Sequence, residues 1–502
     1  MKSLQKYLVF ISIFICFSLQ NSWAKSIEQA DIYFQQQQYK LAIDEYLSLA
    51  DAGNARAYYQ LGAIYYNGFG IEKSEAQALI WFALAAEYDF ENSAEIVNEL
   101  LAGASAADQD KLLGIIAQFK KNYGKQGIQD KYFPQFNEAN LSEKIIYSNG
   151  KQLDASYETT DEGFIESDDS STTFEEELFD DEEGFTEQTF QSSKVLENFN
   201  NRPYLLVVDY DIAPDGSRRN FNPVQVIGNP NKGILDLSYS NSLKPTFKGK
   251  SVNFVHRSYL GVANYGPFEI RREMGFLYSR VTRYVRKLAD SKVPKEQYQH
   301  AAALMYFTWL KQEEGQVEAL LKSSSEGGYI PAQFEYGLLL YREQKNIKLA
   351  VELISKAALQ GFTQAEYRLG RLILDSPWII QDDKRALFWL ELAAQKAHVG
   401  ATLKTSEVKL LSKNKKLLDA LGAIDLLAKL PETEAENPEY LYLQALAHNN
   451  MRPRKLSVAV TYIREAIELG NDRGWDVTLW QDTLKRWTSG GSVTIVEMAT
   501  DD

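Results

Sequence analysis

Apolar and small side chains recur with helical spacing over most of the chain, and residues 57–94 show this pattern most completely. Apolar residues three and four positions apart mark two helices in this stretch, at Leu61, Ile64 and Tyr65 and then at Leu79, Phe82 and Ala86. Gly62 lies inside the first helix, where glycine costs about 1 kcal/mol relative to alanine, so we expect a close approach of the second helix there. Gly68 and Gly70 supply the left-handed conformations of a short turn between the two helices.

The same spacing of small residues returns later in the chain. An alanine followed five residues later by glycine occurs at Ala57/Gly62, Ala332/Gly337 and Ala365/Gly370. In the second helices, two alanines seven residues apart occur at Ala78/Ala85, Ala350/Ala357, Ala386/Ala393 and Ala459/Ala466. Successive copies are 33 residues apart at Ala332 and Ala365, a period typical of stacked helical hairpins. The spacing therefore favours an α-solenoid over a generic helical bundle.

The signature A-x-x-x-L-G-x-x-Y-x-x-G-x-G, followed by A-L-x-W-x-x-x-A-A, resembles the Sel1-like repeat, a branch of the tetratricopeptide superfamily. The resemblance implies a concave helical surface that binds proteins. It assigns a structural role in the repeats to seven residues: Gly62, Gly68, Gly70, Trp81, Gly337, Gly370 and Trp389. The two tryptophans occupy equivalent positions, and core packing explains them best.

A different pattern begins at residue 203. Residues 205–212 are rich in β-branched side chains and predict a strand. Pro214-Asp215-Gly216 is a turn signature, and 224–227 reads as the return strand. A short helix over 232–243 and a third strand entered through 249–255 complete a β-β-α-β order, which fits a small α+β domain.

This segment resembles the C-terminal domain of TonB-family energy transducers, through VVDYDIAPDG at 207–216, VQVI at 224–227 and LKPTFKGKSV at 243–252. The resemblance implies a sheet whose edge adds a peptide strand through main-chain hydrogen bonds. The last strand, around 251–259, is the candidate edge. The residues expected to contact a partner there are Ser251, Asn253, Val255 and Arg257.

Residues 1–24 read as a secretory signal, with basic residues first, an apolar run over 7–19 and a small-x-small cleavage site at 22–24. An uncleaved anchor is the alternative. Cys16 is the only cysteine and lies in the apolar run, so the mature chain has no disulfide, thiol or zinc-thiolate chemistry. We therefore expect a periplasmic protein of a Gram-negative envelope, with no membrane span after signal cleavage.

Charge is unevenly distributed along the chain. Residues 152–193 contain fifteen acids and no lysine or arginine, which predicts a disordered linker. Residues 200–290 carry fourteen basic and seven acidic side chains, and the basic ones concentrate along a helix expected over 276–288. Two interpretations stay open: the linker is a solvated tether, or its acids and phenylalanines bind a basic surface in this chain or another. The basic helix in turn is a solvated face, a site for the linker, or a site for an anionic envelope component.

The predicted fold is mainly α, a solenoid of Sel1/TPR-like hairpins with an inserted α+β (ββαβ, TonB C-terminal-like) domain. The expected organisation is a signal peptide (1–24), helical repeats (25–123), an irregular then acidic linker (124–199), the α+β domain with its basic helix (200–290), further repeats (291–489) and a tail (490–502).

We found no constellation of residues that indicates catalysis. The four histidines have no metal-ligand spacing, and phosphate loops, nucleophile elbows and paired catalytic carboxylates are missing from the sequence. The sequence therefore favours a non-enzymatic interaction adaptor without cofactor, whose partners are envelope proteins such as outer-membrane receptors or cell-wall machinery. A TonB-family energy-transducing component of outer-membrane transport is the alternative, and an envelope hydrolase a third that no residue supports. An acidic pI near 5.1 and export argue against nucleic acid as a partner.

Overall fold

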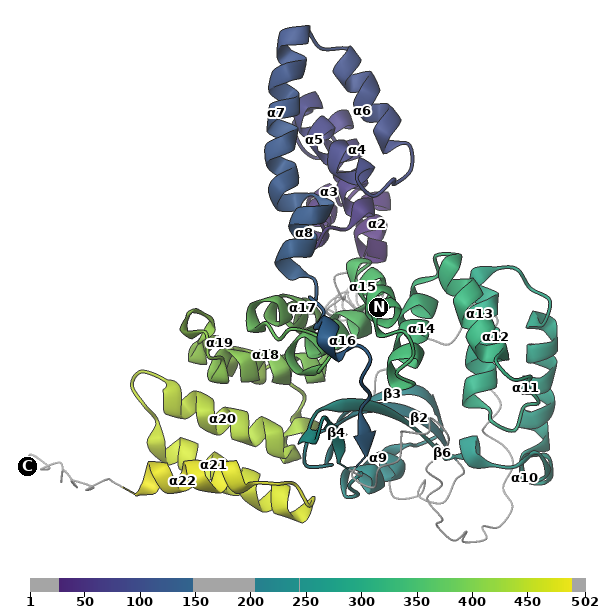
Figure 1. Cartoon of the computed structure of the whole chain (residues 1–502), viewed down its shortest axis with the longest axis vertical. Helices are drawn as coiled ribbons and strands as arrows, with labels where there is room; N and C mark the ends of the chain where they lie inside the picture. Colours follow the sequence, from purple (N-terminus) through teal and green to yellow (C-terminus); the bar gives the residue numbers. More distant parts are fainter. Residues whose placement is uncertain (1–26, 148–203, 243, 490–502) are drawn as a thin grey trace, which may run out of the picture. The chain divides into compact units, whose positions relative to one another are not determined.

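The computed structural model describes residues 27–147, 204–242 and 244–489, and the chain is mostly helical (Figure 1). The expected signal peptide, acidic linker and tail lie outside the described residues. The described chain forms two compact units. The first comprises the described part of Met1–Phe133 with Ala358–Gly370 and Phe388–Thr402, and the second comprises the described remainder.

The first unit begins with antiparallel helices that follow the predicted hairpin pattern. Their bounds are α2 Ile27–Gln35, α3 Tyr39–Asp51, α4 Ala55–Asn67, α5 Glu75–Ala86, α6 Ser93–Ala102, α7 Ala106–Tyr123 and α8 Lys125–Tyr132. Asn54 caps the start of α4 by accepting a hydrogen bond from the Ala57 amide, and Gly68, whose φ is 74°, caps its end. At Gly62, a Cβ atom would lie 2.8 Å from the Phe82 ring. Glycine therefore sets the close spacing of α4 and α5, which we call the first hairpin.

Helix α8 occupies a stretch that we predicted to be irregular. Its inward side chain is Ile128, which is 1% exposed and lies against Gly53. A helix of eight residues with one buried apolar side chain has no detectable periodicity, so packing rather than local pattern stabilises it. The prediction of irregular chain from residue 124 was wrong at this point.

The inserted domain has the predicted β-β-α-β order. Strands β2 Leu205–Ile212, β3 Arg218–Ile227 and β6 Phe254–Gly261 form an antiparallel sheet in the order β3-β2-β6, and α9 Asn231–Ser238 lies between β3 and β6 in the chain. A second small sheet has the order β1-β4-β5, with bounds β1 Ile146–Tyr147, β4 Pro245–Phe247 and β5 Lys250–Ser251.

The third strand of the inserted domain starts later than predicted. Lys248 and Gly249 both have positive φ and form a two-residue turn between β4 and β5. The chain therefore reverses at 248–249, and the long strand β6 begins only at Phe254.

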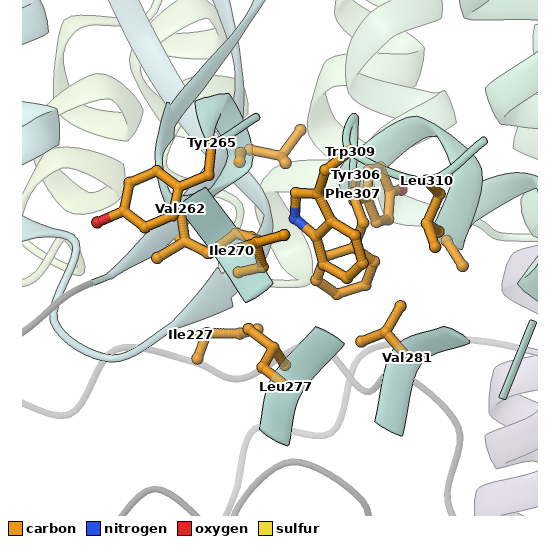
Figure 2. Packing of buried hydrophobic residues seen from close by; sticks show 14 of the residues in the cluster. Ile227, Val262, Tyr265, Ile270, Leu277, Val281, Tyr306, Phe307, Trp309 and Leu310 are labelled. Carbon is orange, nitrogen blue, oxygen red and sulfur yellow. The ribbon is translucent and has the colours of Figure 1, made fainter. Parts of the chain in front are cut away.

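Both faces of the β3-β2-β6 sheet are packed against other elements, and its central strand β2 is buried along its whole length. One face carries Leu206, Val208 and Tyr210, which pack with Leu237 of α9. The other face packs on α10 Pro267–Glu273, α11 Gly275–Leu288 and α12 Pro294–Tyr306. Figure 2 shows this second core, where residues including Ile227, Val262, Ile270, Leu277, Val281 and Trp309 meet.

The remaining helices continue the hairpin pattern. Their bounds are α13 Gln316–Glu326, α14 Ile330–Arg342, α15 Ile347–Leu359, α16 Thr363–Asp375, α17 Asp383–Gln395, α18 Val399–Leu411, α19 Ala420–Leu427, α20 Pro438–Asn450, α21 Leu456–Asp472 and α22 Thr478–Thr488. We call α14–α15 the second hairpin and α16–α17 the third. A Cβ at Gly337 would lie 2.8 Å from the Ala350 carbonyl oxygen, so the second hairpin is as tightly spaced as the first.

Candidate protein-interaction surfaces

A groove with a volume of about 350 Å³ opens on the first hairpin. Its lining residues are Tyr59, Ala63, Tyr66 and Asn67 of α4, Phe82 of α5, and Ile96, Glu99 and Leu100 of α6. The α4 residues are three and four positions apart, so helical geometry places them on one face. We refer to this site as the groove.

The groove combines aromatic surface with polar tips. The Tyr59 ring meets Phe82 edge to face at 5.3 Å between centroids, and its hydroxyl donates to Asn92 Oδ1 at 3.0 Å. Tyr66 is 40% exposed, and the Lys73 ammonium lies 5.0 Å from its ring centroid. Aromatic side chains with hydroxyl groups are the residues that protein interfaces favour, because they bury large area and still form hydrogen bonds. The groove is therefore chemically suited to a protein side chain.

The matching face of the later hairpins has a different occupant. Ala57 of the first hairpin corresponds to Ala332 of the second, 275 residues later. The counterparts of Tyr66 and Asn67 are therefore Tyr341 and Arg342. The Tyr341 ring packs against Phe254 of β6, with 5.7 Å between centroids. Arg342 is paired with an acid of strand β2, Asp209.

The third hairpin repeats this arrangement. Ala57 also corresponds to Ala365 of the third hairpin, 308 residues later, so the counterpart of Ala63 is Arg371. The Arg371 guanidinium lies 3.4 Å from a carboxylate oxygen of Asp211, on the same strand β2. The face that forms a groove in the first hairpin thus binds the chain's own sheet in the second and third.

Four charged residues form a buried ion cluster where the sheet meets the second hairpin: Asp209, Arg257, Glu335 and Arg342. Arg257 forms two hydrogen bonds with Asp209, at 2.7 and 2.8 Å, and two with Glu335, at 2.6 and 3.0 Å. Arg342 reaches Asp209 at 3.1 Å and Glu335 at 3.4 Å. All four side chains are at most 9% exposed. Two positive and two negative charges in this geometry offset the cost of burying each one.

Burial and nearby charges set the protonation states of Arg257 in the cluster and of the adjacent His256. Burial opposes the charge on Arg257, but the attraction of Asp209 and Glu335 outweighs it and holds the pKa of Arg257 well above its usual value. Burial, together with the positive charges of Arg342 and Arg218, lowers the pKa of His256 to about 4. His256 is therefore neutral at physiological pH.

Residues 135–147, which include a short 3-10 helix at Glu138–Asn140, run along the turns of the second and third hairpins. Gln344 clamps its backbone: the Ile145 amide donates to Gln344 Oε1 at 2.6 Å, and Gln344 Nε2 donates to the Ile145 carbonyl at 2.9 Å. Further along, the Ile380 amide donates to the Gln135 carbonyl at 2.8 Å. These contacts show that the hairpin turns bind extended main chain.

The structure places the four residues predicted to contact a partner in different environments. Ser251 is exposed on β5, and Asn253 is half-buried in the chain between β5 and β6. Val255 and Arg257 are 2% and 5% exposed in β6. Arg257 belongs to the ion cluster, so a partner would reach this side chain only if the sheet separated from α14.

The equivalent tryptophans Trp81 and Trp389 differ in their hydrogen bonding. Trp389 is fully buried and donates from Nε1 to the Tyr132 carbonyl at 2.8 Å. Trp81 is half-buried and stacks on Tyr58 at 5.8 Å. Its indole N–H has no acceptor among the residues that the structure describes.

Sequence reasoning missed the ion cluster, the Gln344 clamp and the groove. A signal existed for the cluster: Asp209 and Asp211 alternate with apolar residues in β2, which places both carboxylates on one face of the strand. Buried acids on a strand require basic partners from another element.

Two further properties were tested over the described ranges. No described helix combines the length and the apolar character that crossing a membrane requires. Within the same residues, no group of three or more histidine, cysteine, aspartate and glutamate side chains is arranged to hold a metal ion.

Two solved structures are similar to parts of this chain. The solved Sel1 repeat protein from Oxalobacter formigenes is 22% identical over 40% of this chain, which spans 57% of that protein, with a TM-score of 0.30. The structure of c5321, described as a protective antigen present in uropathogenic Escherichia coli strains displaying an SLR fold, is 17% identical and has a TM-score of 0.33; the match covers 88% of this chain and 79% of that one. A comparison with curated proteins gave no match.

The model of the Sel1 repeat matches residues 55–87, 330–362 and 363–398. These ranges contain the first, second and third hairpins. The chain therefore carries three Sel1 repeats, a repeat that serves as a scaffold for protein–protein interaction.

Proposed function

We propose that this chain is a non-enzymatic adaptor of the Gram-negative periplasm that binds a partner protein in the groove of the first hairpin. The observation that carries the proposal is the open aromatic face of α4, whose counterparts in α14 and α16 hold the chain's own sheet. One repeat face thus binds protein within the molecule, and the same face of the first hairpin is accessible.

The internal contacts suggest what the groove binds. Tyr341 receives the aromatic side chain of Phe254, which projects from a strand, and Tyr66 is its counterpart in the groove. Asn67 replaces the charged Arg342, so the groove needs no acid from its partner. The fitting ligand is an extended segment of an envelope protein that presents an aromatic or aliphatic side chain to Tyr66 and a polar group to Asn67.

The sheet supports a second part of the proposal. Its β-β-α-β order, with β6 at an edge, supports the resemblance to the TonB C-terminal domain, and we propose that it pairs with a peptide strand of an envelope partner. The alternative function, an energy-transducing component of outer-membrane transport, requires an N-terminus that stays anchored. N-terminal sequencing of the mature protein separates the two, because an adaptor begins after residue 24 and a transducer retains the apolar run.

The groove is tested with a tyrosine substitution and a matched control. A crosslinked partner is first identified from envelope fractions with the full chain and then purified for titration. We expect Tyr66→Ala to weaken its binding about 10-fold or more, as aromatic hot spots do. Tyr239→Ala removes another exposed tyrosine, 53% exposed and outside the groove, and should leave the dissociation constant unchanged. Equal affinities for both variants would exclude the groove as the binding site.

A further inference from the structure

The outer surface of α10 and α11 is basic and aromatic. Its main side chains are Phe268, Arg272, Phe276, Arg280, Arg283 and Arg286. The opposite face of α11 is fixed in the core by Leu277 and Val281, which are 4% and 0% exposed (Figure 2). The helix therefore cannot turn its apolar side outward, and the basic–aromatic surface is held in a fixed orientation.

Two phenylalanines on this surface face solvent. Phe268 is 74% exposed and Phe276 is 58% exposed. The guanidinium of Arg272 lies 5.8 Å from the Phe268 ring, and that of Arg280 lies 6.0 Å from the Phe276 ring. Aromatic rings flanked by guanidinium groups offer apolar area and positive charge together, so they suit a ligand with both phenyl rings and carboxylates.

The positive charge of the surface exceeds what its own acids neutralise. Residues 267–288 contain six basic and two acidic side chains. Glu269 accepts from the Gly266 amide at 2.8 Å, and Glu273 pairs with Arg272. Arg283, Arg286 and Lys287 form no ion pair with any other described residue. A concentrated positive field is thus left for an anionic ligand.

We propose that the acidic segment of the same chain, residues 154–190, binds this basic–aromatic surface. The segment carries fifteen acids and no basic residue, which matches the surface in charge. Its phenylalanines, which match the exposed rings in chemistry, are Phe164, Phe174, Phe179, Phe185 and Phe190. This intramolecular interaction is separate from the binding proposed for the groove and for the sheet edge.

Covalent connection brings the two partners together. The Tyr204 carbonyl accepts a hydrogen bond from the Val262 amide at 2.8 Å, and α10 begins at Pro267. Residues 191–203 link the acidic segment to Tyr204, which is hydrogen-bonded to Val262, five residues before α10 begins. A tether of this kind gives an effective concentration on the order of millimolar, so weak ion pairs suffice.

Energy transfer between two dyes tests the contact in the full chain. The variant carries Cys16→Ser, Ser171→Cys in the segment and Ser279→Cys on α11, so that only the two new cysteines are labelled. We expect high transfer efficiency at low salt and a marked loss at about 1 M NaCl, where the Debye length is about 3 Å.

Charge reversal identifies the binding surface. Arg280→Glu, Arg283→Glu and Arg286→Glu together should abolish transfer at low salt. The matched control Lys413→Glu, Lys415→Glu and Lys416→Glu changes the net charge equally at exposed positions outside the surface and should preserve transfer. Should the first variant fail to fold, Glu175→Gln, Glu176→Gln and Glu177→Gln weaken the contact from the side of the segment and should lower transfer as well.

Two results overturn the proposal. One is equal transfer in the surface variant, the segment variant and the control. The other is that the full chain binds phosphatidylglycerol vesicles and Arg283→Glu abolishes this binding while energy transfer is unchanged. The ligand of the surface would then be a membrane.

Discussion

The first and second hairpins share a backbone plan but use the same face in opposite ways. In the first, Tyr66 and Asn67 border an open groove. In the second, the corresponding Tyr341 and Arg342 hold Phe254 and Asp209 of the inserted sheet. The comparison teaches that the same face of a Sel1 repeat can stay open or can hold another part of its own chain, and that the two faces differ in their side chains.

The energetic character of the two faces differs accordingly. The second hairpin and the sheet bury two positive and two negative charges together. This pairing demands a specific geometry, because any one of these charges buried without its partner would be strongly unfavourable. The groove buries no ion pair and is lined mainly by aromatic and aliphatic side chains. An internal interface gains from strict pairing, whereas a binding surface gains from accessible apolar area.

The largest expected effect comes from breaking the ion cluster. Arg257→Leu leaves Asp209 and Glu335 buried without their main partner and should lower the free energy of unfolding by about 3–5 kcal/mol. Lys356→Leu breaks an exposed pair with Glu352, whose side chains are 53% and 58% exposed, and should change it by less than about 0.5 kcal/mol. Urea unfolding followed by fluorescence measures the free energy of unfolding of both variants. An equally small decrease for Arg257→Leu and Lys356→Leu would mean that the cluster adds nothing to stability.

Acidification should destabilise the sheet that packs on the second hairpin, through His256 of β6. His256 binds a proton in the unfolded chain below a pKa of about 6.5 but in the folded protein only below about 4. Stability from this group is therefore complete above pH 6.5 and falls by about 3 kcal/mol as the pH drops from 6.5 to 4. The difference in unfolding free energy between wild type and His256→Gln should shrink over this window. A difference that is independent of pH would contradict the assigned shift.

The two hairpin glycines should respond unequally to alanine. In Gly337→Ala the new Cβ meets backbone, the Ala350 carbonyl oxygen at 2.8 Å and the Ile354 amide nitrogen at 3.1 Å, which should cost about 1–3 kcal/mol. In Gly62→Ala it meets the Phe82 ring at 2.8 Å, which is a side chain rather than backbone, although it is only 3% exposed and must shift. Alanine recovers about 1 kcal/mol of helix propensity at both positions, so the Gly62 variant should lose less stability than the Gly337 variant because a side chain can shift where backbone cannot. Thermal unfolding compares the two, and a costlier Gly62→Ala would show that Phe82 is rigid.

The smallest effect concerns the equivalent tryptophans. Trp389→Phe removes a donor from the Tyr132 carbonyl, in a part-buried hydrogen bond, whereas Trp81→Phe removes an indole N–H that has no acceptor among the described residues. We expect Trp389→Phe to be more destabilising by about 1 kcal/mol, the net value of a typical intramolecular hydrogen bond. Equal unfolding midpoints for the two variants would argue against this assignment.

Local patterns predicted most of the elements but few of the contacts. The spacing of alanine and glycine located the hairpins, and the strand expected over 205–212 is β2. The ion cluster was beyond such patterns because Arg257 and Glu335 are 78 residues apart, and only the packing of the sheet against α14 brings them together. The groove was hidden for another reason: Tyr59 and Tyr66 occupy apolar helix positions that look identical in sequence whether a neighbour covers them or solvent does.

The amide clamp at Gln344 has a consequence for how this molecule tolerates change. Both of its hydrogen bonds end on main-chain atoms of Ile145, atoms that every residue except proline provides in full. The clamp is therefore indifferent to which amino acid stands at that position and sensitive only to the loss of the amide hydrogen. Substitutions at Ile145 are therefore limited by what its side chain packs against, and proline alone would remove the amide that donates to Gln344.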